Sequence, residues 1–185
     1  TGKQTIKGSF FHGEKHGLCL VESPDRSFLG YFSHGLKSGV GVAQAADGSI
    51  LKGVYSKGLL RGLSILVKGE DLTVGKFDPT GLTGTAIEER PGKQYVGRFK
   101  DGRKCGIGML KEGEQKYLGY WSQGRRQGFG VHTGQGEYYA GEWLENAKHG
   151  VGRQEFGSQK IKYVGEFKKN DREGFGRLEA EDWVY

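Results

Sequence analysis

Aromatic and small residues alternate with other residue types along the chain, most clearly at Tyr139-Ala140-Gly141-Glu142-Trp143. Successive side chains of a β-strand point to opposite faces of the sheet, so Tyr139, Gly141 and Trp143 would share one face. Polar and basic residues follow, and a second alternating segment begins at Gly150. The pattern predicts a β-hairpin in which the glycine leaves space for the rings on either side of it.

The same spacing recurs from one end of the chain to the other, with 22 to 24 residues between equivalent glycines. Such a period indicates a repeat architecture in which one supersecondary unit stacks on the next. A second glycine follows nine residues after the first, and the stretch between them commonly holds a Gly or Asn, as a turn with positive φ requires. The eight first glycines are Gly8, Gly30, Gly53, Gly75, Gly97, Gly119, Gly141 and Gly165.

The positions that flank each first glycine are aromatic or apolar in nearly every unit. The position two residues before the glycine holds Ile6, Phe28, Leu51, Thr73, Tyr95, Tyr117, Tyr139 and Tyr163. The position two residues after the glycine holds Phe10, Phe32, Tyr55, Phe77, Phe99, Trp121, Trp143 and Phe167. The residue directly after the second glycine is also mostly apolar, at Leu18, Val40, Leu63, Ile107, Phe129, Val151 and Phe175.

The composition agrees with a repeat array and argues against an ordinary globular core. The 185 residues include 35 glycines and 3 prolines, and 35% of them are hydrophobic. A repeat array compensates for such a thin apolar content by burying the face of each unit against its neighbours. The expected fold class is therefore all-β, an array of stacked antiparallel β-hairpins.

Two segments, YAGEWLENAKHGVG and YVGEFKKNDREGFG, closely match the pattern YxGxWxxGxxxGxG. In this pattern the chain resembles the MORN (membrane occupation and recognition nexus) repeat family, over nearly its whole length from Ile6 to Gly176. The resemblance implies an elongated, twisted, single-layer sheet. It also implies roles in scaffolding and in protein or membrane association rather than in chemistry.

We predict one array over residues 1–185, in which the fourth repeat is the weak joint. There Thr73 replaces the aromatic residue, Thr85 replaces an apolar one, and Pro79 enters the turn. A ninth repeat would begin at Tyr185. The predicted repeats cover about residues 6–27, 28–50, 51–72, 73–94, 95–116, 117–138, 139–162 and 163–184.

The sequence offers no candidate for catalytic or metal-binding chemistry. It contains no GxxxxGK[ST] phosphate-binding loop. The histidines His12, His16, His34, His132 and His149 lack the spacing of metal ligands. We therefore expect no catalytic residues, no metal site and no cofactor, and we expect that this segment is not an enzyme.

The two cysteines, Cys19 and Cys105, lie about four repeats apart, too far for an intramolecular disulfide. We therefore expect a reduced, cytoplasmic setting. The resemblance to MORN repeats further implies association with the cytoskeleton or a membrane. No run of 18 apolar residues is present, so no transmembrane helix is expected.

One basic position recurs in the hairpin turns, seven residues after the first glycine. It is absent from the fourth repeat and is displaced by one residue in the third, and the formal net charge of the chain is +6. One interpretation is solvated turn charge, and the other is a basic stripe along one edge that binds an anion or an anionic lipid. The residues of this column are Lys15, Lys37, Arg61, Lys104, Arg126, Lys148 and Arg172.

We consider three functional hypotheses. The first, which the resemblance implies, is a rigid scaffold whose aromatic face binds a partner peptide or helix in a cytoskeletal, ciliary or membrane-associated assembly. The second is peripheral binding of anionic phospholipid through the basic stripe, and the third is a regulatory repeat domain of an enzyme that lies outside this segment. Nucleic acid is not an expected partner, whereas a homodimer through the array ends is compatible with the pattern. The candidate aromatic face comprises Tyr95, Phe99, Tyr117, Trp121, Tyr139, Trp143, Tyr163 and Phe167.

Overall fold

The computed structural model describes residues 3–158 and 160–180, and within these residues it contains strands and turns but no helix. The chain divides into two compact units, Thr1–Pro91 and Gly92–Tyr185. The predicted ninth repeat, which would begin at Tyr185, lies outside the described residues.

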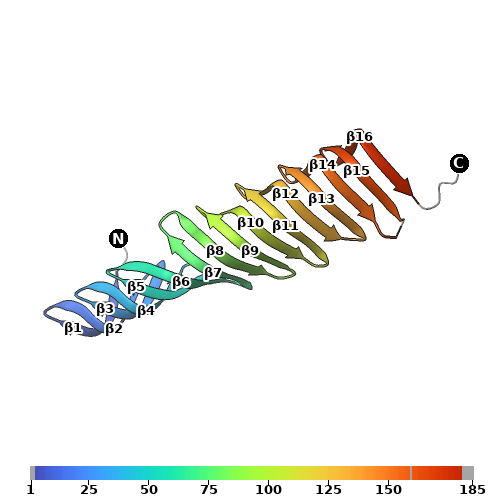
Figure 1. Cartoon of the computed structure of the whole chain (residues 1–185). Coiled ribbons are helices and arrows are strands. Elements are labelled where there is room, and N and C mark those ends of the chain that lie inside the picture. The colour runs from blue at the N-terminus through green and yellow to red at the C-terminus, as the bar shows by residue number, and fades with distance from the viewer. Residues whose placement is uncertain (1–2, 159, 181–185) are drawn as a thin grey trace. The chain divides into compact units, whose positions relative to one another are not determined.

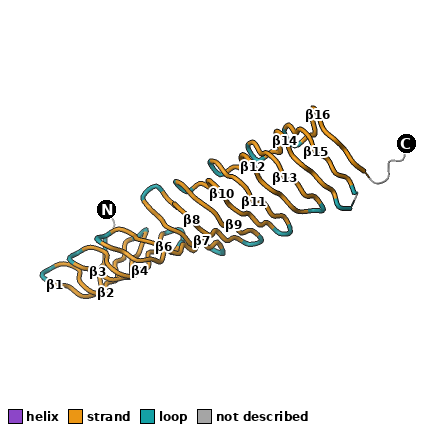
Figure 2. Tube along the Cα trace, in the orientation of Figure 1, coloured by secondary structure: helices purple, strands orange, loops and turns teal. Residues whose placement is uncertain are grey.

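Each unit consists of eight strands joined by short loops (Figures 1 and 2). The first unit contains β1 (Thr5–Phe11), β2 (Glu14–Ser23), β3 (Arg26–Ser33), β4 (Leu36–Ala45), β5 (Ile50–Ser56), β6 (Leu59–Lys68), β7 (Asp71–Asp78) and β8 (Gly81–Arg90). The second contains β9 (Lys93–Lys100), β10 (Arg103–Glu112), β11 (Gln115–Ser122), β12 (Arg125–Gly134), β13 (Glu137–Leu144), β14 (Ala147–Phe156), β15 (Ile161–Lys168) and β16 (Asp171–Ala180).

Within each unit, every strand pairs antiparallel with the strand that precedes it and the strand that follows it in the sequence. This holds from β1 to β8 in the first unit. It also holds from β9 to β16 in the second. The predicted all-β architecture of stacked antiparallel hairpins is therefore confirmed.

Local turn chemistry explains why these segments form hairpins. The β11–β12 turn has positive φ at both central residues, 50° at Gln123 and 82° at Gly124, as a type I′ turn requires. Equivalent pairs with positive φ occur in the other hairpins except the fourth. In the fourth, Asp78 Oδ1 instead accepts hydrogen bonds from the Thr80 amide and hydroxyl, at 2.8 and 2.7 Å.

A β-bulge near the second glycine of each repeat decides which residues share a face. In the sixth repeat Gly119 faces Gly130, yet Trp121 faces Arg126, because the returning strand holds two extra residues between these pairs. Gly128 has a φ of 66° within the bulge, which explains why glycine recurs at this position. The bulge thus places the basic residue directly opposite the second ring of the repeat.

The core is formed by rings that lie flat on pairs of glycines, as the sequence predicts. Tyr139 is 0% exposed and covers Gly141 and Gly152, where an added Cβ would come within 2.5 and 2.6 Å of its hydroxyl oxygen. That hydroxyl donates a hydrogen bond to the Glu142 carbonyl at 2.8 Å. Phe167 from the next repeat packs edge-on against the Tyr139 ring, with 5.1 Å between centroids. We call the surface that carries these rings the ring face.

The first unit builds its core on the same principle with more varied residues. A buried cluster comprises Cys19, Phe28, Phe32 and Tyr55, and Leu60 packs against it. The Cys19 thiol donates to the Ser9 carbonyl at 3.3 Å and fills the space left by a small residue. In the fourth repeat, Leu82 and Ala86 are buried over Gly75, where the repeats of the second unit place a tyrosine ring.

We expect the backbone amides of residues 74–77 to exchange with solvent faster than those of residues 96–99. The fourth repeat buries aliphatic side chains where the fifth buries the Tyr95 ring, and one lost ring removes up to about 3 kcal/mol of burial. Hydrogen exchange measured by mass spectrometry on the intact chain would compare the two segments. Equal protection would show that the fourth repeat is no weaker than the fifth.

Candidate functional site

Basic side chains cover the rings of both units. In the sixth repeat the Arg126 guanidinium carbon lies 4.2 Å from the Trp143 ring centroid and 5.5 Å from that of Tyr117. Equivalent contacts are Lys15 over Phe32 at 5.4 Å, Lys37 over Phe28 at 3.9 Å, Lys104 over Tyr95 at 4.6 Å, Lys148 over Tyr139 at 5.2 Å and Arg172 over Tyr163 at 5.0 Å. Such cation–π contacts contribute about 0.5–2 kcal/mol, depending on how far the cation is desolvated.

This arrangement corrects the expected basic stripe along the edge of the sheet. These six cations lie on the ring face, because the bulge pairs each of them with a ring residue, as in Trp143 with Lys148. The basic column and the aromatic column, which were expected to form two separate surfaces, are therefore two layers of the same face in each unit. The turn edge itself is held by backbone hydrogen bonds between successive repeats, such as Asn146 N to Arg126 O at 3.0 Å.

Arg61 does not belong to this layer. It pairs with Val54, whereas its neighbour Leu60 pairs with Tyr55 on the ring face. A displacement of one residue along a strand moves a side chain to the opposite face of the sheet. Leucine therefore takes the place of the cation in the third repeat, and Leu82, opposite Phe77, does the same in the fourth.

The eight rings of the candidate aromatic face are buried, with exposed fractions between 0% and 7%. They also contact one another across repeats, as in the edge-on pair of Tyr117 and Trp143, whose centroids are 5.2 Å apart. A partner that approaches the ring face would therefore meet lysine and arginine head groups and the borders of the rings, rather than an open aromatic surface.

Two tyrosines of this layer, Tyr117 and Tyr139, stay neutral and act as hydrogen-bond donors. Burial raises the pKa of Tyr117 to about 12, despite the opposing charge of Arg126. Burial also raises the pKa of Tyr139 to about 12, and the charge of Glu142 adds to this effect. Both hydroxyls donate to carbonyls three residues further on, so the rings support the cations through their faces and not through a phenolate charge.

In each unit, the face opposite the ring face exposes a band of large apolar side chains, which we call the apolar ribbon of that unit. Each of these side chains is at least 37% exposed. The first unit contributes Leu18, Leu29, Tyr31, Val40, Val42, Val54, Leu63, Ile65 and Ile87. The second contributes Ile107, Met109, Leu118, Tyr120, Phe129, Val151 and Val164.

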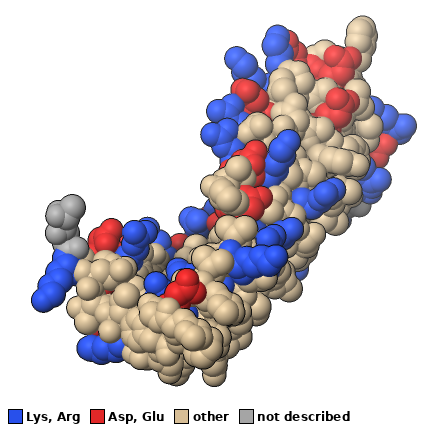
Figure 3. Space-filling model, turned by 90° about the vertical axis from the view of Figure 1, so that its left-hand side faces the viewer, with Lys and Arg blue, Asp and Glu red and all other residues tan. Residues whose placement is uncertain are grey.

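In the first unit the apolar ribbon contains a shallow recess of about 380 Å³ bordered by Leu29, Val42 and Leu63. Figure 3 shows one side of the molecule, on which uncharged residues form broad areas between lysine and arginine side chains. The sequence contains a signal for the ribbon, because the position after the second glycine is mostly apolar. That signal does not reveal whether another layer covers the position.

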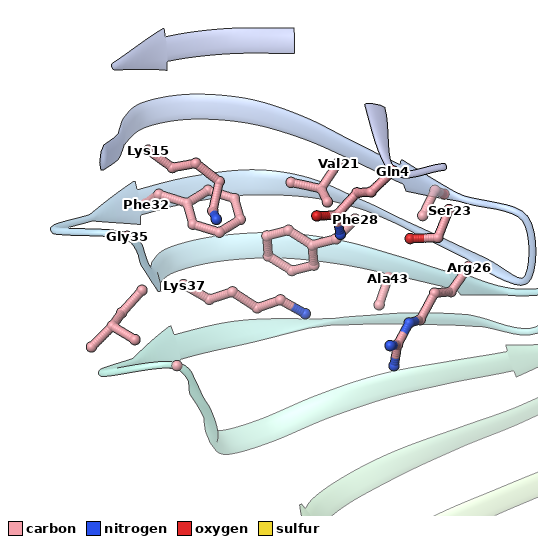
Figure 4. A pocket seen from close by; sticks show the side chains of 13 residues that line it. Gln4, Lys15, Val21, Ser23, Arg26, Phe28, Phe32, Gly35, Lys37 and Ala43 are labelled. Carbon is pink, nitrogen blue, oxygen red and sulfur yellow. The ribbon is translucent and has the colours of Figure 1, made fainter. Parts of the chain in front are cut away.

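The ring face is hollowed in both units. In the first unit a recess of about 390 Å³ is lined by Lys15, Lys37 and Arg26 around Phe28 and Phe32 (Figure 4). In the second unit a recess of about 300 Å³ is lined by Lys104, Lys116 and Arg126, together with Glu112 and His132. Both recesses are basic, but only the second has a carboxylate among the described residues that line it.

Within residues 3–158 and 160–180, no group of three or more His, Cys, Asp and Glu residues could hold a metal ion. In the same part of the chain, no helix has the length and apolar character needed to span a membrane. Cys19 and Cys105 are both free thiols.

Comparison with known proteins identifies a repeat family. The family model described as "MORN repeat" matches residues 7–27, 28–50, 95–111, 117–137, 139–160 and 163–184, together more than half of the chain. No curated protein matches the chain. Among solved structures, "KlHsv2 with loop 6CD replaced by a Gly-Ser linker" is similar at 8% identity, with 90% of this chain and 94% of that chain covered. Its TM-score is 0.20, too low to carry an argument.

Proposed function

The chain belongs to the MORN repeat family, and from this premise we propose that it is a scaffold without catalytic activity of its own that binds a partner protein along its strands. MORN repeats are associated with binding to proteins or to membrane lipids. The kind of partner we propose is based on the surfaces of this chain. A cytoplasmic assembly at the cytoskeleton, a cilium or a membrane is the setting we propose for it.

The observation that carries this proposal is the apolar ribbon. Val40, Leu63 and Phe129 are 61%, 70% and 58% exposed, although each stands in the middle of a paired strand. An exposed apolar surface of this kind within one unit is typical of interaction sites, because its exposure to water is unfavourable. The strands already hold these side chains in place, so a partner binds them without a large additional cost in ordering.

The chemistry of the ribbon suggests the kind of partner. The recess in the first unit includes Lys52 beside its aliphatic side chains, and Arg61 pairs with Val54 on the same face. A helix or extended peptide with an apolar stripe and flanking acidic residues would complement this surface. The ring face, with its candidate residues Tyr95 to Phe167 beneath the cations, is proposed as a second contact surface for acidic groups.

The ribbon is tested by substituting threonine for Val40, Val54 and Leu63 together. Threonine keeps strand propensity while removing apolar surface. We expect affinity capture with the intact chain, followed by mass spectrometry, to lose its specific partner with this variant. Because these side chains are exposed, the free energy of unfolding should change by only about 0.5 kcal/mol per site.

A matched control removes an exposed leucine elsewhere in the same unit. Leu59 is 55% exposed and stands beside a hairpin turn. Its replacement by threonine should leave the captured proteins unchanged. If the ribbon variant captures the same proteins as the wild-type chain, the ribbon is not the docking surface.

Peripheral binding of anionic phospholipid is the alternative function, favoured by the recurrence of a cation on the ring face in six of the repeats. Co-sedimentation with phosphatidylserine vesicles separates the two functions. Binding that survives the ribbon substitutions and disappears at high salt would assign the chain to lipid rather than protein. A regulatory role for an enzyme outside this segment, and a homodimer through the array ends, stay predictions.

A further inference from the structure

The recess on the ring face of the first unit gathers three cations from three consecutive strands. Lys15 comes from β2, Arg26 from β3 and Lys37 from β4. Figure 4 shows the Lys37 side chain extended beneath Phe28 toward Arg26. The neutral side chains of Gln4, Ser23 and Ser27 also line the recess and supply hydrogen-bonding groups.

The second and seventh repeats differ in charge at the equivalent positions. In the seventh repeat Glu137 stands four residues before the first glycine and forms an ion pair with Lys148, seven residues after that glycine. The glutamate is further fixed by a hydrogen bond from the Gln154 amide at 2.5 Å. In the second repeat the equivalent positions hold Arg26 and Lys37. Where the seventh repeat neutralises its lysine, the second repeat adds a second positive charge.

No carboxylate compensates these charges in the described part of the first unit. Neither Arg26, Lys15 nor Lys37 forms an ion pair with any described residue. Burial lowers the pKa of Lys37, and the charge of Arg26 lowers it further. Two like charges held close together in a partly desolvated recess raise the free energy of the empty site, and an anion bound between them would lower it.

The two lysines are held in position before any ligand arrives. The Lys37 ammonium lies 3.9 Å from the Phe28 centroid and 5.3 Å from that of Tyr55, and Lys15 lies over Phe32. These rings are buried, with exposed fractions of 4%, 6% and 6% for Phe28, Phe32 and Tyr55. A ligand would therefore contact the charged head groups and the hydroxyl and amide groups of the rim, rather than stack on the rings.

From this geometry we propose that the recess binds a phosphate monoester carried on a serine or threonine side chain of a partner protein. A phosphoryl dianion matches three cations better than a single carboxylate does, and Arg26 can bind it with two parallel hydrogen bonds. The site is a recess of about 390 Å³ with half-buried lysines, which suits a group presented on a side chain more than the flat surface of a bilayer. The site is separate from the apolar ribbon and does not depend on it.

The test measures binding of a short phosphoserine peptide and its unphosphorylated form by calorimetry at fixed ionic strength. The intact chain is compared with Arg26→Gln and Arg26→Glu, and with Arg61→Gln and Arg61→Glu as controls that change the same charge on the opposite face. Arg26 and Arg61 are both exposed, so all four variants should fold. Thermal melting provides a second readout.

We expect the phosphopeptide, and not its unphosphorylated form, to bind the wild-type chain and both Arg61 variants alike. Affinity should fall at least about tenfold in Arg26→Gln, since a hydrogen-bonded charge is lost. It should become undetectable in Arg26→Glu, which recreates the Lys–Glu pair of the seventh repeat and should also raise the melting temperature.

Three outcomes would overturn the proposal. Equal losses in the Arg26 and Arg61 variants would mean nonspecific attraction to net positive charge. A glutamate peptide that binds as tightly as the phosphopeptide would mean a general carboxylate site. Arg26-dependent binding to phosphatidylserine vesicles, without binding of the phosphopeptide or of inorganic phosphate, would assign the recess to lipid headgroups.

Discussion

Replacement of Trp143 by alanine is expected to reduce the free energy of unfolding of the second unit by about 3–5 kcal/mol, as is typical of a buried aromatic residue. Trp143 is 4% exposed and joins two repeats. Its ring packs edge-on against Tyr117 and Tyr139 at 5.2 and 5.3 Å, and its indole nitrogen donates to the Gly130 carbonyl at 3.2 Å. The alanine variant would lose all of these contacts and leave Arg126 without the nearer of its two rings.

Two companion variants make this result interpretable. Phe129→Ala removes an aromatic side chain that is 58% exposed on the opposite face, and it should cost less than about 1 kcal/mol. Trp143→Phe keeps a ring, as Phe99 and Phe167 do at the same position, and should cost about 1 kcal/mol through the lost hydrogen bond. Urea denaturation followed by circular dichroism measures all three. Similar losses for Trp143→Ala and Phe129→Ala would contradict the assignment of the two faces.

Gly141→Val is expected to destabilise the same unit by about 1–3 kcal/mol through overpacking. A Cβ atom at Gly141 would lie 2.5 Å from the Gly152 Cα atom and 2.5 Å from the Tyr139 hydroxyl oxygen. The Gly152 backbone belongs to the paired strand β14, so relief requires the Tyr139 ring to leave its place or the two strands to separate. Either change exposes a ring that is 0% exposed in the wild-type chain.

The control for this substitution is Gly157→Val. An added Cβ at Gly157 meets no atom within 4 Å, so the same change of residue should have little effect there. Thermal melting of both variants beside the wild-type chain measures the difference. An unchanged melting temperature for Gly141→Val would mean that the ring does not lie over the glycine pair.

Short-range geometry is the part of this structure that could be predicted well. The alternation of Tyr139, Gly141 and Trp143 places them on one face of a strand, and a paired Gln and Gly with positive φ closes a tight hairpin. These features depend on residues within about ten positions of one another, so the period of the sequence carries them directly. The ring-over-glycine packing follows from the same local pattern, because only glycine leaves room for a ring two residues away.

The face on which the basic column lies could not be predicted from the local sequence. The position of this column in the turn region suggested an edge, but the bulge near the second glycine adds residues to the returning strand and turns Arg126 onto the ring face. In the third repeat the basic residue stands one position later along the returning strand. Arg61 therefore lies on the opposite face, and Leu60 lies over the core. Whether a residue lies on one face or the other depends on the pairing register after the bulge, and that register is a property of two strands.

The sequence by itself determined the repeat period, the hairpins and the residues that form the ring layer, because each depends on contacts within a repeat. Only the tertiary structure decided that the rings are buried under cations and that Val40 and Leu63 on the other face are exposed. It also decided that Arg26 and Lys37 line one recess, whereas Glu137 and Lys148 at the equivalent positions form an ion pair. Burial and charge compensation depend on which atoms of neighbouring strands surround a side chain, and the spacing of residues along one strand does not contain that information.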